Sequence, residues 1–184
     1  VISFGNLTAG GTGKTPAVIE RAQHEIAAGN RVAVLTRGYG ASQNSDPIVC
    51  VTSGSARASA DTIGDEPALI LRRVPEVIIV KGTDRVAAAH TAIEQHNCDV
   101  LILDDGFQYL RLSRDENILV VDASNPFGNG HVLPRGILRE PVESAARATH
   151  VLFTHCDRVQ ADNLEKLRAQ MQSLCPKCET RSTY

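Results

Sequence analysis

Short runs of apolar residues, each about as long as one strand, alternate along the chain with stretches that have helical spacing. Val77–Val80 (VIIV), Val100–Leu103 (VLIL) and Ile118–Val121 (ILVV) are continuous apolar runs. Continuous runs of this length are typical of strands that are covered on both faces. Strands that alternate with helices predict right-handed βαβ units. The sequence therefore predicts an α/β fold with a mostly parallel sheet flanked by helices.

The expected elements follow this alternation along the whole chain. Strands are expected at 1–4, 31–36, 48–52, 77–80, 100–103, 118–121 and 151–153, and helices at 16–28, 66–73, 83–96 and 164–174. Sheets of this kind bind ligands at the carboxyl ends of their strands. Polar residues that directly follow a strand are therefore the candidates for function. The long loops 38–59 and 123–141 are expected to be functional or mobile.

The composition excludes several classes of protein. Of the 184 residues, 42% are apolar, and the formal net charge is −2. This apolar content does not fit a disordered chain, and the charge balance does not fit a nucleic-acid-binding protein. No run approaches the about 18 apolar residues that a membrane-spanning helix requires. Residue 1 is Val and already lies in an apolar run, so we expect the chain to be part of a longer protein.

The five cysteines do not predict a disulfide framework. Cys50, Cys98 and Cys156 are isolated, and we expect them to be small buried apolar residues. Cys175 and Cys178 form a C-x-x-C pair, which fits half of a zinc site or a redox pair, although no second pair follows. An odd number of cysteines favours a reducing, cytosolic compartment.

A glycine-rich segment between the first strand and the first helix is the sharpest local signal. It consists of Thr8, Ala9, Gly10, Gly11, Thr12, Gly13, Lys14 and Thr15. The segment fits the phosphate-loop pattern G-x-x-x-x-G-K-[ST], except that Thr8 replaces the first glycine. In such a loop, backbone N–H groups and a helix N-terminus surround an anion. Lys14 would reach the β- and γ-phosphates, and the Thr15 hydroxyl would bind Mg²⁺, so the segment predicts a nucleoside triphosphate site.

Acidic residues follow a second strand directly. Asp104 and Asp105 come after the run Val100–Leu103, where a phosphate-loop protein needs an acid for Mg²⁺. Asp65 precedes a predicted helix, and it fits an N-cap as well as a functional acid. Arg85 opens a helix against the helix dipole, which favours an anion nearby. Arg139 lies in a loop that is either solvated or directed to the ligand edge of the sheet.

Seven segments together resemble one family, the tetraacyldisaccharide 4′-kinases, which act in lipid A biosynthesis in Gram-negative bacteria. In order they are GNLTAGGTGKTP (5–16), TRGYG (36–40), GDEP (64–67), DRVAAA (84–89), DDGFQ (104–108), FGNG (127–130) and LREP (138–141). The family shares the Thr at the first position of the phosphate loop. The resemblance implies a P-loop kinase that transfers the γ-phosphoryl group of ATP to the 4′-hydroxyl of a tetraacyldisaccharide 1-phosphate lipid. Residues 1–184 would form its catalytic lobe.

The resemblance also implies the roles of single residues. Residues 8–13 and Lys14 would hold the phosphates of ATP. The catalytic residues would be Asp65 as the base, Asp104 and Asp105 as an acidic pair at the metal and the nucleophile, and Arg85 and Arg139 as cations for the transferred group. The ligands of Mg²⁺ would be Thr15, Asp104 and Glu140.

The sequence departs from the family at one position, because Tyr109 stands where many members have His after the DDGFQ segment. The family is also longer. The resemblance implies a membrane anchor and a second lobe outside these residues, with the enzyme at the cytoplasmic face of the inner membrane. We therefore expect this chain to bind ATP weakly and to be a poor kinase. The alternatives are another nucleotide-dependent switch or NTPase that uses ATP or GTP, and a non-enzymatic folding or docking unit.

Overall fold

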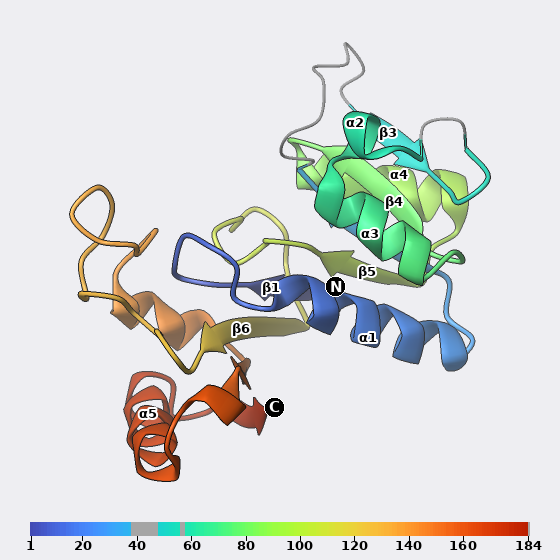
Figure 1. Ribbon diagram of the computed structural model, residues 1–184. Coiled ribbons are helices and arrows are strands. Elements are labelled where there is room, and N and C mark those ends of the chain that lie inside the picture. The colour runs from blue at the N-terminus through green and yellow to red at the C-terminus, as the bar shows by residue number, and fades with distance from the viewer. Residues whose placement is uncertain (38–47, 56–57, 184) are drawn as a thin grey trace. The chain divides into compact units, whose positions relative to one another are not determined.

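The computed structural model of the protein describes residues 1–37, 48–55 and 58–183 (Figure 1). The chain divides into two compact units. Unit 1 consists of Val1–Ile2, Thr15–Asp104 and Tyr109–Ser113, and unit 2 consists of Ser3–Lys14, Asp105–Gln108 and Arg114–Tyr184. Strand β1 (Ile2–Gly5) and helix α1 (Lys14–Ala27) each contribute residues to both units.

Unit 1 contains four strands in the order β3-β4-β2-β5. Their bounds are β2 (Val32–Thr36), β3 (Ile48–Val51), β4 (Ile78–Gly82) and β5 (Val100–Leu103). Strand β2 pairs in parallel with both of its neighbours, and Leu35 lies opposite Val80 and Leu103. Only β3, which pairs with β4, is antiparallel among these described strands. All five residues of β2 are buried, as expected for a strand covered on both faces.

Three further helices belong to unit 1: α2 (Ala60–Ile63), α3 (Asp65–Arg73) and α4 (Arg85–His96). Helix α4 begins after Asp84, whose carboxylate accepts hydrogen bonds from the backbone N–H groups of Val86 and Ala87. It ends at Asn97, which has the left-handed conformation that stops a helix. Its small residues Ala88, Ala89 and Ala92 are buried against the strands, so this helix packs closely on the sheet of unit 1.

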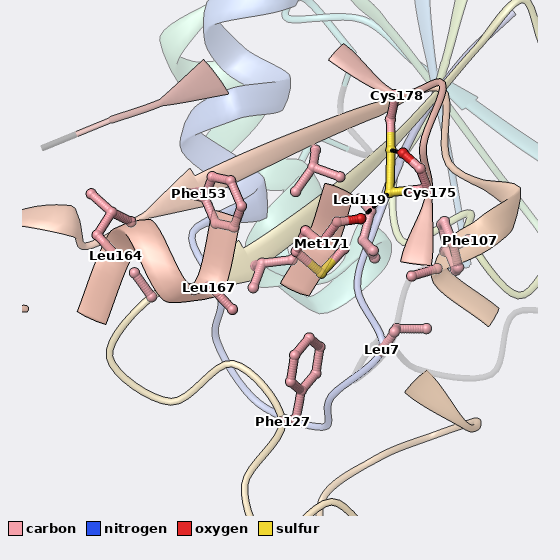
Figure 2. Packing of buried hydrophobic residues seen from close by; sticks show 14 of the residues in the cluster. Leu7, Phe107, Leu119, Phe127, Phe153, Leu164, Leu167, Met171, Cys175 and Cys178 are labelled. Atoms are coloured by element: carbon pink, nitrogen blue, oxygen red, sulfur yellow. Dashed lines mark hydrogen bonds between the residues drawn. A yellow bond between two sulfur atoms is a disulfide. The ribbon is translucent and has the colours of Figure 1, made fainter. Parts of the chain in front are cut away.

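Unit 2 contains three parallel strands in the order β6-β7-β8. These are β6 (Glu116–Asp122), β7 (His150–Thr154) and β8 (Glu179–Ser182). Helix α5 (Ala161–Leu174) and the 3₁₀ helices η1 (Val142–Arg147) and η2 (Cys156–Arg158) accompany them. Figure 2 shows the core of this unit, in which Phe153, Leu167 and Met171 pack together. The predicted mostly parallel α/β fold is thus confirmed in its order of elements.

Among the described residues, four short elements were not predicted: α2, β8 and the 3₁₀ helices η1 and η2. Helix α2 is a single turn, and β8 is a mostly exposed polar strand, so neither has the apolar pattern that identifies an element. The 123–141 loop was expected to be functional or mobile, and the burial of Leu138 in the core of unit 2 anchors the loop and argues against mobility. Most of the predicted 38–59 loop lies outside the described residues.

The cysteines also differ in part from expectation. Cys98 and Cys156 are buried thiols, as predicted, whereas Cys50 is only half-buried. Cys175 and Cys178 form a disulfide where α5 ends, and both are buried in the core of unit 2 (Figure 2). The sequence did not predict this disulfide, because a single C-x-x-C pair without a second pair gave no disulfide framework.

Within the described ranges, every helix is too short or too polar to cross a membrane.

Candidate functional site

The glycine-rich segment after β1 forms a loop that unit 2 holds in place. The backbone N–H of Ala9 donates a hydrogen bond to the carbonyl of Ile137 at 2.7 Å. Thr8 and Leu138 form an antiparallel bridge, and Leu138 is buried in the core. The Thr154 hydroxyl donates to the carbonyl of Thr12 at 2.9 Å. The loop is therefore a fixed cradle, as an anion-binding loop requires.

The backbone of the loop explains both its glycines and its departure from the usual pattern. Gly10 and Gly13 have φ angles of 115° and 79°, which L-residues rarely adopt. A side chain at Gly13 would also meet the methyl group of Thr154 at 3.2 Å. Thr8 does not have a positive φ, and its bridge with Leu138 is a strand-like conformation that suits a β-branched residue. Thr therefore replaces the first glycine without strain.

Three charged side chains of the predicted site come together in unit 2. The Nζ atom of Lys14 lies 3.5 Å from Oδ1 of Asp105, and Nη1 of Arg139 donates a hydrogen bond to Oδ2 of Asp105 at 2.6 Å. Asp105 has a φ of 54°, a left-handed conformation that Asp tolerates better than most residues. The two cations face one carboxylate, so the cluster keeps a net positive charge for an anion.

A buried asparagine, which the sequence reasoning did not select, holds the lysine. Asn6 is fully buried, and its Oδ1 accepts a hydrogen bond from Nζ of Lys14 at 3.1 Å. Its Nδ2 donates to the carbonyl of Thr8 at 2.8 Å. In this part of the described chain, the hydroxyl oxygen of Thr12 is buried and has no hydrogen-bond partner. A phosphate oxygen would satisfy that hydroxyl, so the residues of the loop fit the phosphates of ATP.

Glu140 forms a second polar cluster in unit 2. Its carboxylate accepts hydrogen bonds from Nε2 of Gln108 at 2.7 Å and from Nη2 of Arg147 at 2.7 and 2.8 Å. Gln108 also donates to the backbone carbonyl of Asn6 at 2.9 Å. Neither Gln108 nor Arg147 was selected as a site residue. Gln108 had a signal, because it closes the DDGFQ segment, but Arg147 had none.

The other predicted site residues belong to unit 1. Thr15 is the second residue of α1, and Asp104 follows β5, where it is buried. Asp65 is exposed at the start of α3. Gly64 occupies the N-cap position of that helix, so the interpretation of Asp65 as an N-cap is wrong. The Asp65 carboxylate is thus not used to close the helix.

Arg85 begins α4 and is 95% buried, since its exposed fraction is 5%. Its Nη1 donates to the carbonyl of Gly82 at 2.7 Å, and its guanidinium lies 5.9 Å from the ring centroid of Tyr109. The Tyr109 hydroxyl accepts from the Arg85 backbone N–H and donates to Oδ1 of Asp84, both at 3.1 Å. Hydrogen bonds from the backbone of Ala87 and from Tyr109 lower the pKa of Asp84. Tyr109 therefore supports Arg85.

The oxygen donors Thr15, Asp104 and Glu140 are of the kind that Mg²⁺ prefers. No group of three or more His, Cys, Asp and Glu side chains in the described chain forms a ready metal cage. Mg²⁺ is usually held by one or two carboxylates together with nucleotide phosphates, and each unit offers oxygen donors of this kind. Gly38, Tyr39 and Gly40 of the TRGYG segment lie outside the described residues.

Comparison with solved structures gives a match to a kinase of known structure. The chain is 36% identical to LpxK from Aquifex aeolicus, whose structure was determined in complex with ATP, with a TM-score of 0.75. The match covers 85% of this chain and 48% of that chain.

Comparison with curated proteins gives matches of the same kind. The tetraacyldisaccharide 4′-kinase of Anaeromyxobacter dehalogenans is 49% identical over 169 residues, which cover 92% of this chain and 44% of the relative. The corresponding kinase of Geobacter metallireducens is 51% identical over 161 residues, which cover 88% of this chain and 48% of the relative. The chain thus spans less than half the length of these relatives. The model of the family described as tetraacyldisaccharide-1-P 4′-kinase matches residues 1–183, and the chain belongs to that family.

Proposed function

We propose that residues 1–184 form the catalytic lobe of a kinase that transfers the γ-phosphoryl group of ATP to the 4′-hydroxyl of a tetraacyldisaccharide 1-phosphate lipid. The observation that carries this proposal is the cluster of Lys14, Asp105 and Arg139 beside a rigid glycine-rich loop. Family membership supports the choice of acceptor, because the curated relatives bear the name of this kinase. A site at the cytoplasmic face of the inner membrane follows from a lipid acceptor in lipid A biosynthesis.

The positive charges of unit 2 have a direct use in this reaction. Phosphoryl transfer depends on positioning and on neutralising the charge of the transferred group. Lys14 is held by Asn6 at 3.1 Å, and Arg139 is held by Asp105 at 2.6 Å, so both cations are oriented before the nucleotide binds. Arg85 would add a third cation, which the Gly82 carbonyl and the Tyr109 ring keep in one conformation.

Thr15, Asp104 and Glu140 would hold Mg²⁺. When bound, this ion would neutralise charge on the phosphate oxygens of the nucleotide. Asp105 would orient the cations that face the transferred group. Asp65 would accept the proton of the acceptor hydroxyl, since its carboxylate is exposed and does not cap helix α3.

The role of Asp65 provides the experiment. The substitution Asp65→Asn is expected to lower kcat at least 100-fold, because general-base catalysis contributes about 10²–10⁴-fold. The affinity for ATP should stay within twofold, since Asp65 belongs to the acceptor side of the reaction. Transfer of radiolabelled phosphate from ATP to tetraacyldisaccharide 1-phosphate in detergent micelles measures the rate, and equilibrium dialysis measures ATP binding.

Glu66→Gln is the matched control, because Glu66 is the next acid on the same helix and is also exposed. This variant should keep the wild-type rate. If Asp65→Asn also keeps the wild-type rate, Asp65 is not the base. Phosphorylation of the lipid by the wild type, even at a low rate, supports a lipid kinase, whereas hydrolysis of ATP with no lipid phosphorylation at any enzyme concentration would favour a nucleotide-dependent hydrolase or switch.

A further inference from the structure

The carboxylate of Glu140 is held from two sides. Nη2 of Arg147 contacts both carboxylate oxygens, at 2.8 Å for Oε1 and 2.7 Å for Oε2, and Nε2 of Gln108 contacts Oε1 at 2.7 Å. A carboxylate has about four lone-pair positions, so these contacts fix the orientation of Glu140 and still leave it able to bind a cation. Glu140 is thus oriented in the absence of any ligand.

Arg147 is itself fixed by the core of unit 2. Its guanidinium lies 4.7 Å from the ring centroid of Phe107, which is fully buried. Its backbone carbonyl accepts a hydrogen bond from Nδ2 of Asn117, a buried residue of β6, at 2.9 Å. Because the core fixes Arg147, the hydrogen bonds from Arg147 also fix the position of the Glu140 carboxylate.

The same network reaches the phosphate loop. Gln108 joins Glu140 to the backbone carbonyl of Asn6 at 2.9 Å, and the Asn6 side chain accepts the hydrogen bond of Lys14 at 3.1 Å. Two residues therefore connect the carboxylate to the lysine that would bind phosphate. An arrangement that links a carboxylate and a phosphate-binding lysine fits a metal ion shared with nucleotide phosphates.

The strength of the ion pair argues that its role is not mainly stability. The side chains of Arg147 and Glu140 are 33% and 19% exposed. Ion pairs that water reaches contribute little to stability. A partner that orients a metal-binding carboxylate, in contrast, often changes metal affinity by about 10–100-fold.

We propose that Arg147 is a positioning residue that orients Glu140 for a divalent cation bound together with the nucleotide. This inference rests on the proposed function, because it takes Glu140 as a metal ligand. Arg147 is assigned no contact with the nucleotide or the acceptor, and it acts only through the Glu140 carboxylate.

The test is a titration of the chain with Mn²⁺ at saturating AMP-PNP, a non-hydrolysable ATP analogue, with free Mn²⁺ measured by electron paramagnetic resonance. Arg147→Met should weaken Mn²⁺ binding about 10–100-fold. Arg147→Lys keeps the charge but loses the planar fork of donors, so a smaller loss is expected. The affinity for AMP-PNP in EDTA should stay within twofold in both variants.

Arg168→Met is the matched control, because Arg168 is about as exposed as Arg147 and forms an ion pair with Glu165 on α5 in the same unit. This variant should bind Mn²⁺ like the wild type. Should Arg147→Met fail to fold, Arg147→Lys carries the test alone, and wild-type Mn²⁺ affinity in that variant would overturn the inference.

A second pair of variants separates this inference from the proposed function. If Glu140→Gln weakens Mn²⁺ binding and Arg147→Met does not, the role of Arg147 is wrong and that of Glu140 stands. If Glu140→Gln has no effect, Glu140 is not a metal ligand and both fail. The double variant should bind Mn²⁺ no more weakly than Glu140→Gln alone, and an additional loss would show that Arg147 acts by another route.

Discussion

Gly5 shows how a single residue shapes the site. It is the last residue of β1, and a Cβ atom there would lie 2.6 Å from both the Cβ and the backbone N of Phe107. The backbone N–H of Gly106 donates to the carbonyl of Phe4 at 2.8 Å, so the DDGFQ segment is tied to the end of β1. The absence of a side chain at position 5 therefore allows Phe107 to pack where it supports Arg147.

The substitution Gly5→Ala should consequently lower the stability of unit 2. The added methyl group meets the backbone N and the Cβ atom of Phe107, and this fully buried residue cannot move away cheaply. Overpacking of this kind costs about 1–3 kcal/mol, and urea denaturation measures it as a lower midpoint. Gly54→Ala is the control, because a Cβ atom at Gly54 meets nothing within 4 Å. Equal midpoints for the two variants would contradict the packing argument.

Single residues differ in how well the sequence predicts them. The sequence predicted that Lys14 and Asp105 lie in the functional region, because both follow apolar strands of a parallel sheet. The carboxyl ends of such strands share one edge of the sheet. Asn6 and Arg147 were missed. Asn6 lies in the GNLTAGGTGKTP segment, but its role arises from contacts with Lys14 and Thr8. The role of Arg147, in η1, arises from contacts with Glu140 and Phe107. Neither periodicity nor spacing carries information about such contacts. At Asp65 the local pattern was misleading. Its position at a helix start fitted an N-cap, but Gly64 occupies the N-cap position of α3.

At the scale of elements, the start of α4 combines capping and support of a cation. Asp84 accepts two backbone hydrogen bonds, from Val86 at 2.9 Å and from Ala87 at 3.3 Å, and the hydroxyl of Tyr109 donates to the same oxygen. The helix therefore begins at a residue that also anchors the ring beneath Arg85. The first turn of α4 is therefore stabilised by Tyr109, which lies outside the helix, as well as by its N-cap Asp84.

Removal of the cap should loosen that first turn. Asp84→Ala loses all three hydrogen bonds, so we expect the midpoint of thermal unfolding to fall by about 2–4 °C. Asn is as good an N-cap as Asp but carries no charge, so the midpoint of Asp84→Asn should fall by less than that of Asp84→Ala. Circular dichroism follows both transitions. A fall of equal size in the two variants would mean that charge, and not capping, stabilises the helix start.

Elements that the sequence did not reveal are those without a buried face. Strand β8 has the sequence ETRS, three of its four residues are exposed, and it pairs only with β7 in the described sheet of unit 2. The pairing with β7 supplies its backbone hydrogen bonds, and this pairing does not require an apolar pattern in the sequence of β8. The strands of the interior were found because burial on both faces selects the continuous apolar runs seen in β2 and β5.

At the scale of the whole molecule, carboxylates with lowered pKa values occur in both units. A hydrogen bond from Arg21 is the main cause that lowers the pKa of Glu25 below its ordinary 4.5. Burial alone would raise the pKa of Asp122, but hydrogen bonds from Ser124 and the pairing with His155 outweigh burial and lower it below 3.8. Hydrogen bonds from Ala87 and Tyr109 lower the pKa of Asp84 below 3.8 as well.

These shifts predict how stability depends on pH. A carboxylate whose pKa is lower in the folded state stabilises the fold fully above its unfolded pKa, and this stabilisation is lost as the pH falls through the folded pKa. The contribution of Glu25, Asp84 and Asp122 should therefore be constant from pH 7 to about 5 and decline below about 4.5. The combined variant Glu25→Gln, Asp84→Asn, Asp122→Asn should show a shallower decline in the free energy of unfolding, measured by urea denaturation from pH 7 to 3.

The control is a second triple variant, Glu20→Gln, Glu76→Gln and Asp162→Asn, at three exposed acids. It removes the same charge and should leave the slope of the free energy of unfolding against pH near that of the wild type. If both triple variants have the same slope, net charge and not these hydrogen-bonded carboxylates sets the acid sensitivity of the fold.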